Sequence, residues 1–206
     1  MLFRSFLLVG LLERLGCEVR DLGQVPDDLE ATRAALREAA RDNDLIVTSG
    51  GVSVGEEDHV KPAVEAEGRL DMWKIAIKPG KPLAFGSVRS EGRERAFIGL
   101  PGNPVSSFVT FLMLVRPFIL RLQGVADTAP RAYPLRAACD WPRPDARREF
   151  LRARLNGLGE VELFPQQGAA VLTSAVWADG LIDNAPQQAI RAGDTVRFLP
   201  FSELLD

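Results

Sequence analysis

The most constraining feature of this sequence is a short, continuous apolar run that ends in two glycines. Residues 44–49 read Asp-Leu-Ile-Val-Thr-Ser, and Gly50 and Gly51 follow directly. A run of this length without polar alternation is typical of a parallel strand covered on both faces. Residues 29–39 carry apolar side chains at helical spacing ahead of it, so strands and helices alternate along the chain. This rhythm predicts an α/β layer fold.

Other segments extend this α/β pattern toward the middle of the chain. The apolar start of the chain is expected to be a helix rather than a signal peptide, because Glu13 and Arg14 follow it at once. Val105–Leu122 is apolar but interrupted by Arg116-Pro117, so it is expected to be a buried helix that is too short for a membrane. The remaining expected elements are strands at Cys17–Gly23, Met72–Ile77, Leu83–Val88 and Ala96–Leu100, a helix after Pro26-Asp27-Asp28, and a helix at His59–Glu67.

The character of the sequence changes near Gly124. Prolines and glycines become frequent beyond it, and strands become short and alternating, as in Glu149–Leu155. We therefore expect an α/β domain over residues 1–124 and a small all-β domain over residues 125–206.

Composition excludes several classes of function. The net charge is only -3 and the basic residues are scattered among acidic ones, so no broad field is available to hold nucleic acid. Cys17 and Cys139 lie far apart, which indicates neither a disulfide framework nor a zinc site. His59 is the only histidine and has no nucleophile-elbow pattern beside it, so we expect a surface residue. A small-molecule site in a soluble cytoplasmic protein remains.

The loop after the first apolar strand is a candidate phosphate site. Glycines here let backbone amides turn toward an anion at the start of the next helix, and hydroxyl groups can donate as well. A plain structural turn is the alternative interpretation of a single glycine-rich loop. The candidate binding residues are Thr48, Ser49, Gly50, Gly51, Ser53 and Gly55.

Three carboxylates, Glu56, Glu57 and Asp58, close this loop. Beside a phosphate they would repel the ligand unless a cation lay between them, and Mg²⁺ typically bridges carboxylates to substrate phosphates. Glu56 and Glu57 are equally well explained as residues that stabilise a helix start. Asp58 is therefore the candidate magnesium ligand.

Lysines and a second rigid turn supply further candidates for anion binding. Lys74 and Lys78 are an even number of residues apart and are expected to share one strand face, with Lys81 in the following Pro/Gly turn. Solvated surface lysines are the alternative. Gly99–Pro104 again delivers a strand into a helix N-terminus, and we expect all three loops to meet at one crevice of a parallel sheet. The candidates in this turn are Pro101, Gly102, Asn103, Pro104 and Ser106.

Three motifs together resemble the molybdopterin molybdenumtransferase family, which includes bacterial MoeA and the C-terminal region of gephyrin. They are Ser-Gly-Gly-Val-Ser-Val-Gly-x-x-Asp58, Trp-Lys-Ile-Ala-Ile-Lys-Pro-Gly-Lys-Pro82 and Gly-Leu-Pro-Gly-Asn-Pro-Val-Ser106. The resemblance implies a three-layer αβα molybdopterin-binding domain followed by a small, barrel-like all-β domain, without the N-terminal domains of the family. It implies that Asp27, Asp58, Lys74, Lys78, Pro101 and Pro104 are active-site residues, that Ser49, Gly50, Gly51 and Ser53 cradle phosphate, and that Arg152 and Ser174 border the molybdate site.

The resemblance also implies a reaction. Members of the family insert molybdate into molybdopterin or its AMP adduct with release of AMP, use Mg²⁺, and act as homodimers or other homo-oligomers. Two alternatives stay open: a molybdopterin adenylyltransferase, and a non-catalytic molybdopterin-binding or scaffold fragment. The domain expected over residues 125–206 argues against the adenylyltransferase, because stand-alone members of that class lack it.

Overall fold

The chain folds into two compact units, and the second unit includes a short segment whose neighbours in sequence belong to the first. The computed structural model describes residues 3–51 and 59–205, and for residues 3–5 and 72–74 it describes the backbone only. The first unit consists of Met1–Ile75 and Lys81–Asn103, and the second of Ala76–Gly80 and Pro104–Asp206. Five residues from the first half of the chain therefore belong to the second unit.

The first unit is built on a four-stranded mixed sheet in the order β1-β5-β4-β2. Only β1 and β5 are parallel, whereas β4 is antiparallel to both of its neighbours. The expectation of a parallel sheet was therefore wrong beyond the first strand pair. The reason is local: Glu91 and Gly92, both with positive φ, form a two-residue hairpin turn between β4 and β5. The strands are β1 (Leu45–Ser49), β2 (Gly68–Lys74), β4 (Pro82–Ser90) and β5 (Arg93–Leu100).

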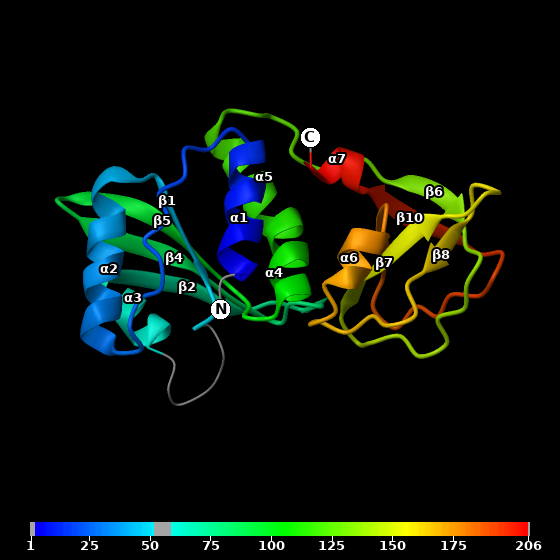
Figure 1. Ribbon diagram of the computed structural model, residues 1–206, viewed down its shortest axis with the longest axis horizontal. Coiled ribbons are helices and arrows are strands. Elements are labelled where there is room, and N and C mark those ends of the chain that lie inside the picture. The colour runs from blue at the N-terminus through cyan, green and yellow to red at the C-terminus, as the bar shows by residue number, and fades with distance from the viewer. Residues whose placement is uncertain (1–2, 52–58, 206) are drawn as a thin grey trace. The chain divides into compact units, whose positions relative to one another are not determined.

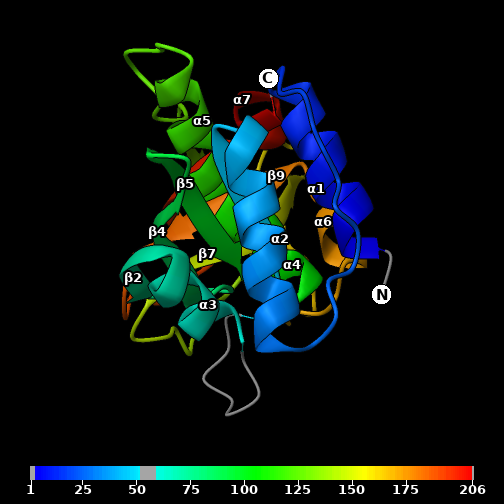
Figure 2. The same ribbon diagram turned by 90° about the vertical axis from the view of Figure 1, so that its left-hand side faces the viewer.

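Helices flank this sheet on both sides, as a three-layer arrangement requires. In Figure 1, α2 and α3 cover one face and α1 lies on the other side, while Figure 2 shows α2 and α3 on the side of the sheet that faces the viewer. The helices are α1 (Phe3–Arg14), α2 (Leu29–Asp42) and α3 (Val60–Glu67). Their core with the sheet is formed by Leu36, Ala39, Ala40, Ile46, Ala63, Val64, Ala84, Val88 and Phe97.

Local signals end and begin these helices. Asp28 caps α2 by accepting a hydrogen bond from the Ala31 amide, as the acidic residues before this helix predicted. Gly16, with φ of 76°, ends α1 in a Schellman motif, in which the Cys17 amide donates to Leu12 O and the Gly16 amide to Glu13 O.

The strand expected at Cys17–Gly23 does not form. This segment has no regular secondary structure, and Arg20 pairs with Glu38 and Asp42 of α2. The Arg20 side chain thus contacts the surface of α2, and Asp21 accepts a hydrogen bond from the Gly23 amide within the segment. The prediction failed because alternation alone does not supply a neighbouring strand.

The second unit contains a six-stranded sheet in the order β3-β7-β9-β10-β6, with β8 paired to β7. A bridge between Ala137, just after β6, and Val161 of β8 links the two edges of this sheet and gives the unit its barrel-like curvature. The strands are β3 (Ile77–Lys78), β6 (Tyr133–Arg136), β7 (Arg148–Leu155), β8 (Val161–Leu163), β9 (Gly180–Asn184) and β10 (Thr195–Pro200). Its core contains Ala137, Leu151, Ala153, Val161, Ile182, Ile190, Val196 and Phe198.

A long helix also belongs to this unit, although the sequence assigned it to a domain ending at residue 124. It runs through α4 (Pro104–Thr110), the π-helical turn η1 (Phe111–Val115) and α5 (Arg116–Leu122). The break expected at Arg116-Pro117 is absent, because the wider π turn accommodates Pro117, which has no amide hydrogen to donate. By length and composition this is the one helix among the described residues that could cross a membrane, so the expectation that it is too short was wrong; most of it is buried inside the protein, as expected for a core helix. Two short helices, α6 (Thr173–Trp177) and α7 (Phe201–Leu205), complete the unit.

Two glycine substitutions test the packing of the first unit. A Cβ on Gly86 of β4 would lie 2.1 Å from the carbonyl oxygen of Arg69 in β2, whereas a Cβ on Gly10 of α1 meets nothing within 4 Å. Gly86→Ala should lower the free energy of unfolding by about 1–3 kcal/mol through overpacking. Gly10→Ala should raise it by about 0.5–1 kcal/mol because a helical glycine is replaced. Urea unfolding followed by circular dichroism measures both, and effects of the same sign would contradict the described packing.

Candidate functional site

The first candidate site lies where β1 and β5 end together. Their parallel register pairs Ser49 with Leu100, and the Gly50 amide donates a 3.0 Å hydrogen bond to Leu100 O. The glycine-rich loop and the Pro101 turn therefore start side by side. Gly50 and Gly51 have φ of 90° and 70°, a conformation that favours glycine and turns the backbone sharply.

The loop between β2 and β4 reaches the same edge of the sheet. Antiparallel pairing places Ala84 beside Gly99, and Lys74 beside Pro82. The edge that contains Leu100 thus also contains the end of β2, the start of β4 and the exposed Lys81. In the described backbone, the strand ends that border these three loops therefore lie at one edge of the sheet, and a shared crevice at that edge stays a prediction.

Asp27 lies at this edge for a topological reason. Only Asn43 and Asp44 connect α2 to β1, so α2 runs antiparallel to the strand and its N-terminus returns toward the strand's carboxyl end. Asp27 is exposed just before the capping residue Asp28. Its assignment to the site stays a prediction.

Two hydroxyl groups give this edge its chemical character. The side-chain oxygens of Thr48 and Ser49 are shielded from solvent and have no hydrogen-bond partner in the described part of the protein. Buried polar groups are normally paired, and an orphaned one costs about 1–3 kcal/mol. Hydroxyls in this state beside glycine amides are suited to donate to the oxygens of an anion.

Several predicted residues lie outside what the structure describes. Ser53, Gly55 and Asp58 fall in residues 52–58, and Lys74 is described by its backbone alone. Residues 3–51 and 59–205 contain no group of three or more His, Cys, Asp or Glu side chains that could hold a metal ion. The magnesium site therefore stays a prediction that depends on Asp58.

Lys78 is separated from Lys74 in a way that the sequence did not predict. β2 ends at Lys74, and Lys78 belongs to β3, which pairs with β7 in the second unit. The expectation that both lysines share one strand face was wrong, because the chain changes sheets between them. Even spacing has meaning only within one strand.

The residues predicted around Pro104 divide at the boundary between the units. Pro101 is buried after β5, with Gly102 half-buried and Asn103 exposed. Pro104 is the first residue of α4, as predicted, and Ser106 is buried within that helix. Binding roles for these residues stay predictions.

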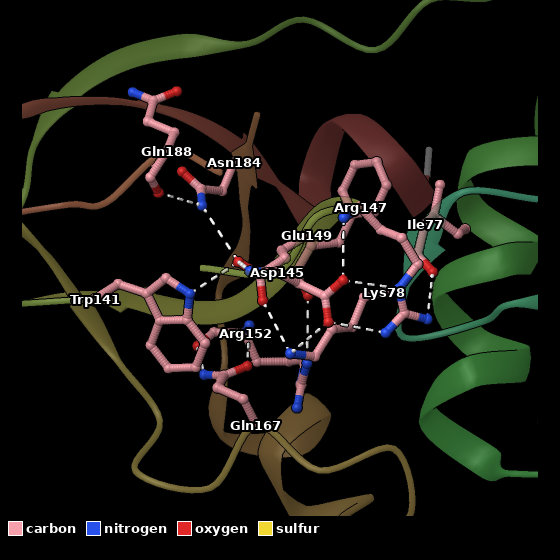
Figure 3. A network of polar contacts seen from close by, with 11 residues as sticks. Ile77, Lys78, Trp141, Asp145, Arg147, Glu149, Arg152, Gln167, Asn184 and Gln188 are labelled. Carbon is pink, nitrogen blue, oxygen red and sulfur yellow. Dashed lines mark hydrogen bonds and ion pairs between the residues drawn. The ribbon is translucent and has the colours of Figure 1, made fainter. Parts of the chain in front are cut away.

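In the second unit, Arg152 and Ser174 are brought together as the resemblance implied. Both are buried, and Arg152 Nε donates to Ser174 Oγ at 3.0 Å. Its guanidinium also donates to the carbonyl oxygens of Phe150 and Gly168, each at 3.3 Å. The Gln167 side chain accepts a hydrogen bond from the Arg152 amide and donates one to the Arg152 carbonyl oxygen (Figure 3). No carboxylate among the described residues pairs with it, and burial lowers the pKa of its guanidinium to about 10. A buried cation in this state favours an anionic ligand.

Lys78 lies in a polar network that sequence analysis missed. Its Nζ is 3.3 Å from Asp145 Oδ2 and 3.1 Å from Glu149 Oε1 (Figure 3). Asp145 also binds Arg147, whose guanidinium and amide hold the pKa of the Asp145 carboxyl well below its ordinary value. One signal was available: Glu149 alternates with Leu151 and Ala153, so it falls on the core face of its strand.

Comparison with known proteins decides the family. Residues 4–121 match a family profile described as "Probable molybdopterin binding domain", and residues 134–201 match one described as "MoeA C-terminal region (domain IV)". The chain belongs to the molybdopterin-binding domain family. The resemblance seen in its three motifs is thereby confirmed.

The relatives that this chain matches are longer proteins. It is 40% identical over 201 residues to molybdopterin molybdenumtransferase of Haemophilus influenzae, covering 95% of this chain and 49% of that protein. The enzyme of the same name from Synechococcus elongatus is 36% identical, with coverages of 92% and 46%. A solved MoeA structure from Pyrococcus horikoshii is 28% identical at a TM-score of 0.77, covering 96% of this chain and 47% of that one. The chain spans about half the length of these relatives.

The orphaned hydroxyls yield a prediction that needs no ligand. Thr48→Val removes the unpartnered oxygen at nearly constant shape, so the free energy of unfolding should rise by about 1 kcal/mol. Thr32→Val is the matched control, since Thr32 Oγ1 donates to Asp28 O at 2.8 Å, and its loss should lower stability by about 0.5–1 kcal/mol. Urea unfolding measures both, and a destabilised Thr48→Val protein would mean that the hydroxyl has a partner.

Proposed function

We propose that this chain acts in molybdenum cofactor biosynthesis, binding molybdopterin or its AMP adduct and inserting molybdate with release of AMP. The observation that carries the proposal is the edge of the first sheet, where two glycines with positive φ lie beside the unpartnered hydroxyls of Thr48 and Ser49. Names of the longer relatives support the reaction.

The phosphate end of the substrate is assigned to the first unit. Amides of the Gly50-Gly51 turn and the two buried hydroxyls donate hydrogen bonds to phosphate oxygens, while the exposed Lys81 supplies positive charge at the same edge. These groups are held by strand pairing before the ligand arrives. The protein thus acts by positioning and by preorganised electrostatics.

Molybdate is assigned to the second unit, near Arg152. The guanidinium lacks a carboxylate partner in the described residues, so an oxyanion would compensate its charge. Asp58 is the proposed Mg²⁺ ligand on the evidence of its motif, and the ion would neutralise phosphate charge when bound. A cytoplasmic homodimer or other homo-oligomer is the assembly we propose.

Binding and turnover of molybdopterin-AMP test the function directly. Calorimetry of the purified chain should show binding that Mg²⁺ strengthens, and chromatography should show AMP release only when molybdate is added. Asp58→Ala should abolish the Mg²⁺-dependent turnover while circular dichroism stays unchanged. Binding without AMP release would select a non-catalytic binding or scaffold fragment, and consumption of ATP without molybdate would select an adenylyltransferase.

Arg152→Lys tests the molybdate assignment. Lysine keeps the charge but loses the planar fork, so the molybdate concentration for half-maximal AMP release should rise roughly tenfold or more. Binding of molybdopterin-AMP itself should change little. Arg154→Lys, on the same strand but paired with Glu162, is the control that should leave the molybdate dependence intact. Equal effects of the two substitutions would assign Arg152 to structure alone.

A further inference from the structure

Glu149 is a fully buried carboxylate at the start of β7, and its two oxygens are used differently (Figure 3). Oε2 accepts hydrogen bonds from Trp141 Nε1 at 2.9 Å, the Asp145 amide at 3.1 Å and Asn184 Nδ2 at 3.4 Å. These contacts fix the orientation of the carboxylate from three separate parts of the second unit.

The other oxygen, Oε1, points at Lys78. It has no hydrogen-bond donor of good geometry among the described residues, and Lys78 Nζ lies 3.1 Å away as an ion pair. A buried carboxylate oxygen requires a compensating charge, and Lys78 provides it. Strand register makes this contact obligatory, because Lys78 and Glu149 are direct partners in the parallel pairing of β3 with β7.

Lys78 needs such a partner because its own strand is short. β3 has two residues, so few backbone hydrogen bonds fix it, and the lysine side chain is 37% exposed. An ammonium group carries three N–H donors. Its ion pairs with Glu149 and Asp145 hold the group from the buried side, and its exposed side keeps donor capacity for a ligand.

Attraction of an anion does not explain the two carboxylates. Lys78 and Arg147 contribute two positive charges, and Asp145 and Glu149 contribute two negative ones. The cluster is neutral, so each carboxylate weakens the field that an anionic ligand meets. If Glu149 acted by charge alone, its neutralisation would strengthen anion binding.

We propose that Glu149 is a positioning residue that fixes the ammonium group of Lys78 so that one N–H faces the substrate. The inference rests on the proposed function for the anionic substrate, and it adds Lys78 to the groups that would contact that substrate. Glu149→Gln is the sharp test, because glutamine keeps the shape and one acceptor oxygen for Trp141 but turns an amide donor, or an uncharged oxygen, toward the lysine.

The first experiment measures the order of the Lys78 ammonium group directly and needs no substrate. The chain has four lysines, Lys61, Lys74, Lys78 and Lys81, so ¹⁵N spectra of the ammonium groups are simple to assign with Lys78→Arg. In the wild-type protein the Lys78 ammonium should be more ordered than that of the exposed Lys81. Glu149→Gln should reduce its order to that of Lys81, whereas the control Glu162→Gln, which removes the partner of Arg154, should not. Equal order of Lys78 and Lys81 in the wild type would overturn the proposal even if Glu149→Gln failed to fold.

The second experiment connects position to binding. Calorimetry should show that Glu149→Gln weakens binding of molybdopterin-AMP by roughly tenfold or more, the scale of a misplaced contact. In a Lys78→Met background the same substitution should have almost no further effect, which a merely structural role would not produce. Tighter binding by Glu149→Gln, or an undiminished effect without Lys78, would overturn the proposal. Absence of binding by the wild type would refute the proposed function and leave the spectroscopic test of Lys78 to decide the positioning role.

Discussion

A single backbone hydrogen bond, from the Ile75 amide to the Lys81 carbonyl at 3.0 Å, closes the base of the loop on which both candidate sites depend. Below it, β2 and β4 remain paired in the first sheet through Lys74 and Pro82. Beyond it, Ala76–Gly80 leaves that sheet and its strand β3 pairs with β7. The loop therefore assigns two lysines that are four residues apart, Lys74 and Lys78, to different sheets.

Both units keep buried polar groups that a fold selected for stability alone would lack. Examples are the unpartnered hydroxyls of Thr48 and Ser49 in the first unit and, in the second, the guanidinium of Arg152, which has hydrogen-bond partners but no carboxylate among the described residues. Each lies in a well-packed region, where a leucine or valine would cost nothing in desolvation. Such local conflicts between residue type and environment are expected at functional sites.

Sequence succeeded where a local signal decides the structure. The apolar run at Leu45–Ser49, the cap at Asp28 and the start of α4 at Pro104 depend on neighbours in the chain, and they were predicted closely. It failed where distant partners decide. The strand expected at Cys17–Gly23 found no partner, and the even spacing of Lys74 and Lys78 lost its meaning once the chain changed sheets. Pairing of strands distant in sequence is not encoded in the periodicity of either strand.

The same reasoning separates the electrostatic roles in the second unit. Around Lys78 the two positive and two negative charges cancel. The cluster therefore exerts little net attraction on an anion, and Lys78 would act through the position of its N–H donors. Around Arg152 no carboxylate of the described residues cancels the charge, and burial strengthens its field by excluding water. On the function proposed above, a tetrahedral oxyanion would be attracted mainly by Arg152, and Lys78 would contribute a positioned donor. Glu149 lies on the core face of β7 with Leu151 and Ala153, and a neutral residue there would leave Asp145 as the one carboxylate among the described residues that pairs with the Lys78 ammonium.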